Sequence, residues 1–87
     1  MNLKEEFDQA VAELQQLTKR PSTIELLQLY ALYKQGTEGD VATEKPGGFD
    51  FKAIAKYDAW AELKGKSTEQ AMQEYVALVK QLKAQYA

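Results

Sequence analysis

The chain has 87 residues and a formal net charge of −2, which fits one small domain and argues against a nucleic-acid-binding surface. It contains no cysteine and no histidine, which excludes a disulfide framework, thiolate or imidazole catalysis and the usual zinc sites. The N-terminus is acidic, and no stretch approaches the ~20 apolar residues of a membrane span. We therefore expect a soluble, cytoplasmic protein.

The first predicted helix begins after Asn2 and ends before Pro21, near Thr18. Asn2 followed by Glu5 resembles a capping box. Apolar residues recur at helical spacing and form one stripe: Leu3, Phe7, Ala10, Val11, Leu14 and Leu17.

The second predicted helix starts with a capping box at Ser22 and Glu25 and runs to about Glu38. Its apolar positions spread over roughly 220°, about twice what a packed surface helix needs: Ile24, Leu26, Leu27, Leu29, Tyr30, Ala31 and Tyr33. Lys34 falls inside this arc. Either the helix is central and the lysine snorkels over leucine, or part of the arc faces something other than protein.

The third predicted helix follows Asp50 as N-cap and ends at Lys64, with Gly65 in the left-handed position beyond it. The fourth starts after Ser67 and continues close to the C-terminus. Its apolar arc of roughly 160° is an ordinary core face, formed by Ala71, Met72, Tyr75, Val76, Leu78, Val79, Leu82 and Tyr86. We expect Trp60 and Leu78 to belong to the core.

The segment from Gly39 to Phe49 is long enough to cross one end of a helix bundle. The other two connections are short, which favours antiparallel neighbours. The sequence therefore predicts an all-α four-helix bundle that need not follow a simple up-down-up-down order.

Lysines are segregated from acidic residues on the third helix. Lys52 and Lys56 share one face, whereas Asp58 and Glu62 share another. A solvated surface would tolerate this pattern. Together with Lys34 and the nearby tyrosines, however, the lysines offer ammonium groups for phosphates, aromatic rings for a stacked base and aliphatic surface alongside.

Three runs of sequence closely resemble the acyl-CoA-binding protein family: YALYKQGTEGD, KPGGFDFKAIAKYDAWAELKG and STEQAMQEYVALV. The match covers nearly the whole chain, and residues 1–87 would be a single acyl-CoA-binding domain. The resemblance implies a four-helix bundle with up-down-down-up order, in which the long loop lets helices two and three run the same way. It also implies a monomeric, non-catalytic carrier of medium- to long-chain fatty acyl-CoA in fatty acid metabolism, without cofactor or metal.

The resemblance also implies roles for individual residues. Tyr30 and Lys34 would contact the phosphorylated ribose region, Lys56 would supply a cation for the 3′-phosphate, and Lys52 would lie near the ligand. Tyr33 and Tyr75 would contact the adenine, and Leu26, Leu27 and Ala55 would line the acyl groove. Gln15 and Ile54 stand where many relatives carry lysine, and Tyr57 stands where tryptophan is common.

Two other classes of function stay open on the residues alone. Lys52 beside Lys56 could lower a lysine pKa enough for Schiff-base chemistry. The wide apolar arc of the second helix could instead receive a partner protein. Contact with a membrane or an acyl-CoA-using enzyme is expected to be transient at most, because no basic amphipathic helix or lipidation signal is evident.

Overall fold

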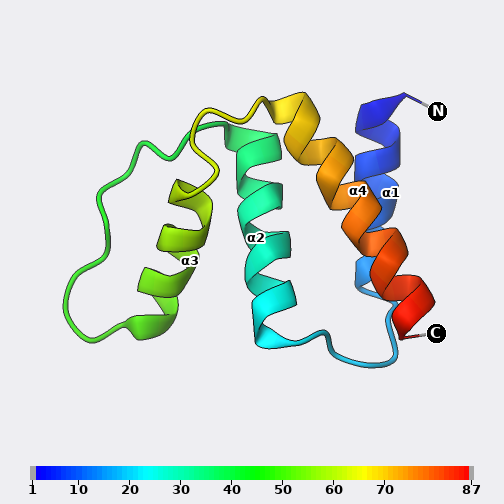
Figure 1. Ribbon diagram of the computed structural model, residues 1–87, viewed down its shortest axis with the longest axis horizontal. Helices are drawn as coiled ribbons and strands as arrows, with labels where there is room; N and C mark the ends of the chain where they lie inside the picture. Colours follow the sequence, from blue (N-terminus) through cyan, green and yellow to red (C-terminus); the bar gives the residue numbers. More distant parts are fainter. Residues whose placement is uncertain (1, 87) are drawn as a thin grey trace.

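The computed structural model describes residues 2–86, in which four helices and no strands are found: α1 (Leu3–Leu14), α2 (Thr23–Glu38), α3 (Phe51–Ala61) and α4 (Thr68–Gln85). Helices α1 and α4 run in one direction, and α2 and α3 run in the other (Figure 1). The crossover between α2 and α3 returns along the molecule, so that both helices start at the same end. The predicted all-α fold with up-down-down-up order is confirmed.

Side-chain caps define all four helix starts as predicted. The oxygens of Asn2, Ser22, Asp50 and Ser67 each accept a hydrogen bond from the backbone N–H three residues later. At Ser22 the reciprocal bond is also present, because its own N–H donates to the Glu25 carboxylate at 2.9 Å. These bonds satisfy backbone donors that a helix leaves without intrahelical partners.

Two helices end earlier than predicted, α1 at Leu14 rather than Thr18 and α3 at Ala61 rather than Lys64. After each end, backbone N–H groups donate to carbonyls three residues back instead of four, which tightens the last turn. Beyond α3 the chain turns at Gly65, whose φ of 94° lies in the left-handed region that glycine tolerates, as predicted.

The core lies between α1, α2 and α4. Phe7 is 1% exposed, and its ring centroid lies 5.0 Å from that of the buried Tyr75. Gly36 allows α4 to pack closely on α2, because a Cβ there would lie 3.2 Å from the Met72 side chain. Leu78, which we expected in the core, is only partly buried and packs against its edge.

Helix α3 stands outside this core and packs against α2 alone among the helices of residues 2–86. A buried polar group fastens its end. Gln35 is fully buried and accepts a hydrogen bond from Trp60 Nε1 at 3.2 Å, while its amide donates to Asp40 and to the Lys66 carbonyl at 2.8 Å each. Asp40 in turn accepts from the Gly65 N–H at 2.8 Å. The ends of α2 and α3 are thus joined by a fully paired network.

Because the network contains Asp40, it makes the free energy of unfolding depend on pH. The Gly65 N–H, and after it the Gln35 amide, hold the pKa of Asp40 below its usual value. A lowered pKa in the folded state adds stability above the unfolded pKa of about 4, and this stability is lost as pH falls through the lowered value. Urea unfolding between pH 7 and pH 2 should show a shallower acid loss for Asp40→Asn, which keeps an acceptor oxygen but does not titrate. An acid dependence equal to that of the unmodified protein would exclude this role of Asp40.

No helix within residues 2–86 is both long and apolar enough to cross a membrane.

Candidate functional site

Between the parallel helices α2 and α3, a lysine of one helix contacts an aromatic ring of the other at two successive helical turns. Lys56 Nζ lies 5.3 Å from the centroid of the Tyr30 ring, and Lys34 Nζ lies 5.0 Å from that of Trp60. Both helices run the same way and advance four residues from one contact to the next, so lysines of α2 and α3 alternate along their junction. We call this line of Tyr30, Lys34, Lys56 and Trp60 the lysine seam. These distances are in the range of cation–π attraction, which holds each ammonium group close to the junction of the helices.

Lys34 agrees with the interpretation of a snorkelling lysine inside the apolar arc. Its stem is largely covered, with 24% of the side chain exposed, and its ammonium group pairs with Glu38 one turn later. The hydrogen bond to Glu38, and after it the charge of that carboxylate, raise the pKa of Lys34 against the opposing effect of burial. The side chain snorkels, yet it keeps a positive charge beside apolar surface.

Lys52 and Lys56 form the second part of this cation set. Lys56 is partly buried and Lys52 is exposed one turn earlier on α3. Among residues 2–86 the ion pairs involve five other lysines, and neither of these two takes part. Two lysines without an ion pair among residues 2–86 thus lie one turn apart on α3, and Lys56 contacts Tyr30.

The tyrosines occupy two different depths. Tyr33 is 41% exposed and stacks on Phe7 with ring centroids 5.8 Å apart, so one of its sides is open. Tyr75 lies beneath, 6.3 Å from Tyr33, and is only 3% exposed. Burial, and to a lesser extent Tyr33, raises the pKa of Tyr75 to about 12. Tyr33 is therefore the ring available for stacking, and Tyr75 supports it from the core.

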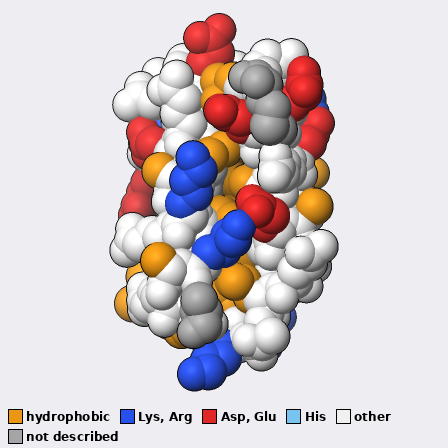
Figure 2. All heavy atoms as spheres, turned by 90° about the vertical axis from the view of Figure 1, so that its right-hand side faces the viewer, with side chains coloured by type: hydrophobic (Ala, Val, Ile, Leu, Met, Phe, Trp, Pro, Cys, Tyr) orange, Lys and Arg blue, Asp and Glu red, His pale blue; other side chains and the backbone are white. Residues whose placement is uncertain are grey.

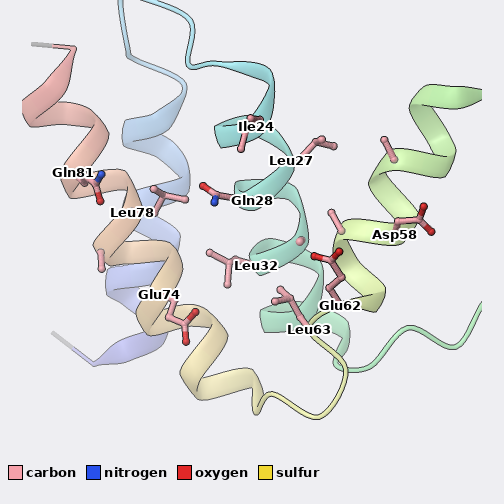
Figure 3. Close-up of a pocket in the computed structure, with 14 residues that line it drawn as sticks. Ile24, Leu27, Gln28, Leu32, Asp58, Glu62, Leu63, Glu74, Leu78 and Gln81 are labelled. Atoms are coloured by element: carbon pink, nitrogen blue, oxygen red, sulfur yellow. The ribbon is translucent and has the colours of Figure 1, made fainter.

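The predicted acyl-lining residues Leu26, Leu27 and Ala55 are all partly buried. Leu27 and Ala55 also line a cleft of about 700 Å³ over α2, with walls from α3 and α4, whereas Leu26 does not (Figure 3). None of the predicted lysines and tyrosines lines this three-helix cleft. The structure thus places Leu27 and Ala55 at the α2–α3 junction, between the lysine seam and the cleft.

Three positions depart from the family pattern, and a side-chain hydrogen bond gives one of them, Tyr57, a structural role. Tyr57 donates a hydrogen bond from its hydroxyl to the Thr43 carbonyl at 3.1 Å, which fastens the crossover to α3. Gln15 is the exposed C-cap of α1, and Ile54 is partly buried. Gln15 and Ile54 carry no charge, so the cations of the candidate site are Lys34, Lys52 and Lys56.

The face formed by α4 and α1 lacks such a segregated set of lysines. On the face formed by α4 and α1, basic and acidic side chains are interspersed (Figure 2), and an ion pair of 2.5 Å between Lys83 and Glu13 joins the two helices. Within residues 2–86 there is also no group of three metal-ligating side chains.

Sequence reasoning missed Gln35, the buried polar residue that connects Trp60 to the turn after α3. A signal was present, since Gln35 follows Ala31 by one helical turn and so shares the apolar side of α2. A glutamine at this spacing indicates a buried hydrogen-bonding position rather than a surface residue.

Comparison with known proteins agrees with this architecture. A family model described as acyl-CoA-binding protein matches residues 4–79. The acyl-CoA-binding protein homolog of Drosophila melanogaster is 52% identical over 85 residues, covering 98% of this chain and 99% of its own. The acyl-CoA-binding protein of Saccharomyces cerevisiae is 53% identical over 81 residues, covering 93% of each.

The crystal structure of Oryza sativa acyl-CoA-binding protein 2 superimposes with a TM-score of 0.92 at 43% identity, covering 97% of this chain and 93% of the other. That of the Moniliophthora perniciosa protein gives 0.89 at 39% identity, covering 99% of this chain and 84% of the other. The chain therefore belongs to the acyl-CoA-binding protein family.

Proposed function

We propose that this protein binds medium- to long-chain fatty acyl-CoA thioesters without changing them, and so buffers and transports the acyl-CoA pool. The observation that carries the proposal is the seam of Tyr30, Lys34 and Lys56, where cations lie directly beside apolar surface. An acyl-CoA has the same division, with anionic phosphates at one end and an apolar chain at the other.

Each part of the seam then has a role. Lys34, Lys56 and Lys52 hold the phosphates, with Tyr30 beside the ribose. Lys34 must exchange Glu38 for a phosphate, which costs little because an exposed ion pair contributes only about 0 to 1 kcal/mol. The open side of Tyr33 receives the adenine, while the buried Tyr75 fixes that ring in place. Leu26, Leu27 and Ala55 line the path of the acyl chain.

We further propose that the protein acts as a monomer in the cytoplasm, with residues 1–87 as one domain and without a catalytic role or cofactor. The sequence has no histidine or cysteine for acid-base or thiolate chemistry. Lys56, the alternative Schiff-base nucleophile, has its amine 5.3 Å from the centroid of the Tyr30 ring, in a cation–π contact. Borohydride trapping with a carbonyl substrate would reveal such chemistry if it occurred.

Calorimetric titration with palmitoyl-CoA, octanoyl-CoA and free CoA tests the proposal. Each buried methylene contributes about 0.8 kcal/mol, so affinity should rise roughly fourfold per added carbon until the groove is full. The phosphate contacts are partly exposed, so raising the salt concentration should weaken binding of all three ligands. Absence of binding to all three ligands at low salt would overturn the proposal and favour a protein-interaction module instead.

A further inference from the structure

The three-helix cleft lies over α2, and none of the lysines of the seam lines it. Figure 3 shows α3 and α4 flanking α2, with Leu32 between them, Leu78 on α4 and Leu63 just beyond α3. Ala31 of α2 also lines the cleft. Packed helix axes are usually 8 to 10 Å apart, so the axes of α3 and α4 on either side of α2 stand at most roughly 16 to 20 Å apart. Half of the diameter of each flanking helix, about 10 to 12 Å including side chains, lies within that span, so a further helix would rest over α2 on the rims of the cleft and reach the floor with its apolar side chains.

The charged side chains that line this cleft are all acidic. Its lining includes Asp58 and Glu62 from α3 and Glu74 from α4, and no lysine or arginine. Asp58 and Glu74 are paired with Lys45 and Lys66 in partly exposed ion pairs, and such pairs are weak enough to exchange partners. Glu62 takes part in no ion pair within residues 2–86. An apolar floor thus lies between two acidic walls.

We propose that the three-helix cleft is a docking site for a basic amphipathic helix of a partner protein. The helix would place apolar residues at i, i+3, i+4 and i+7 over Ala31 and Leu32, and Lys or Arg on both flanks against the acidic walls. The inference goes beyond acyl-CoA binding, because Tyr30, Lys34 and Lys56 do not line the cleft. The two sites adjoin at Leu27 and Ala55, which line the cleft and are also proposed for the acyl path.

The acidic side chains of the cleft favour a basic helix over a bilayer, a free fatty acid or a second copy of this chain. A bilayer rich in anionic lipid would be repelled by Asp58, Glu62 and Glu74, as would a free fatty acid carboxylate. A second copy of this chain carries the same acidic walls and a net charge of −2, so it would have to bring a basic face of its own. A basic helix meets apolar floor and acidic walls together, which is the complementarity that guides specific association.

The test uses a fluorescein-labelled model helix of about 18 residues, built from leucine and lysine with leucine at the apolar positions, and a matched peptide with glutamate in place of lysine. Fluorescence anisotropy would measure peptide binding to the full chain, and amide chemical shifts would locate it. We expect the lysine peptide to bind and the glutamate peptide not to bind, with shifts confined to the facing parts of α2, α3 and α4.

Two variants add positive charge to the walls of the cleft. Glu62→Arg places a cation at the C-terminal end of α3, where the helix dipole favours it, and Ala77→Arg alters an exposed position of α4. Each should weaken lysine-peptide binding about tenfold or more through like-charge repulsion. Glu44→Arg makes the same charge change in the exposed crossover and should alter binding by less than about twofold.

Several results would overturn the proposal. Equal effects of Glu62→Arg and Glu44→Arg would mean non-specific attraction to an acidic protein. Displacement of the peptide by palmitoyl-CoA would mean that the cleft holds the acyl chain, and concentration-dependent shifts of the free protein at the cleft would mean that a second copy covers it. Calorimetry of Glu62→Arg with palmitoyl-CoA is the independent arm: unchanged affinity there leaves the carrier function standing whatever the peptide does.

Discussion

Trp60→Ala should lower the free energy of unfolding by about 3 to 5 kcal/mol, the largest stability loss that we expect from any single truncation of α3. Trp60 is 6% exposed, and its indole N–H donates to Gln35 and to the Gly39 carbonyl at 2.9 Å. Truncation leaves a cavity between α2 and α3 and removes the donor to both buried acceptors. Urea unfolding followed by circular dichroism measures the loss.

Trp60→Phe separates the two contributions. Phenylalanine keeps most of the ring volume but has no N–H, so this variant should lose only the cost of leaving polar groups unpaired, about 1 to 3 kcal/mol. If Trp60→Ala and Trp60→Phe were equally destabilised, the hydrogen bonds and not the packing would dominate. If neither variant were destabilised, the network around Gln35 would not anchor α3.

Lys56→Ala and Lys34→Ala should each weaken palmitoyl-CoA binding about tenfold to a hundredfold, because a charge-assisted hydrogen bond contributes about 1.5 to 3 kcal/mol. The free energy of unfolding should change little, since both amines lie at the surface edge of α2 and α3. Each variant should also lower the salt dependence of binding, because one ionic contact is lost. Titration calorimetry at two salt concentrations measures both effects.

The matched control is Lys80→Ala, which removes an exposed lysine of α4 that lies outside the seam. Its affinity should stay within about twofold of the unmodified protein, because surface charges farther away than about 8 to 10 Å are screened. Unchanged affinity of Lys56→Ala would refute the phosphate role of this residue. An equal loss in Lys80→Ala would show that net charge alone governs binding.

Helix starts could be predicted from the sequence because each rests on a local signal, such as Ser22 with Glu25 three residues later. The ends of α1 and α3 could not be predicted, since the final turns tighten through backbone bonds that no side chain specifies. Helical spacing likewise predicted that Lys52 and Lys56 share one face, because that inference needs only the period of a single helix.

Contacts between helices were harder to predict. The alternation of Lys56 over Tyr30 with Lys34 over Trp60 depends on the register of two parallel helices, which no single periodicity contains. The burial of Tyr75 beneath Tyr33 and the partial exposure of Leu78 have the same origin, since helical spacing fixes which side of α4 faces inward but not how deep. Gln35 shares the apolar side of α2 with Ala31, but two of its partners, Trp60 and Lys66, come from segments distant in sequence, and so its network could not be predicted.

Helix α3 carries Lys52 and Lys56 yet rests on α2 alone. Elements with few neighbours open locally at a lower free energy than the whole fold, so α3 can lift from α2 while α1, α2 and α4 stay assembled around Phe7. A ligand that spans the seam would tie α3 down, and the lifting of α3 would set the ligand free. An attachment to one neighbouring helix thus gives a carrier a way to hand over its cargo without unfolding the rest of the domain.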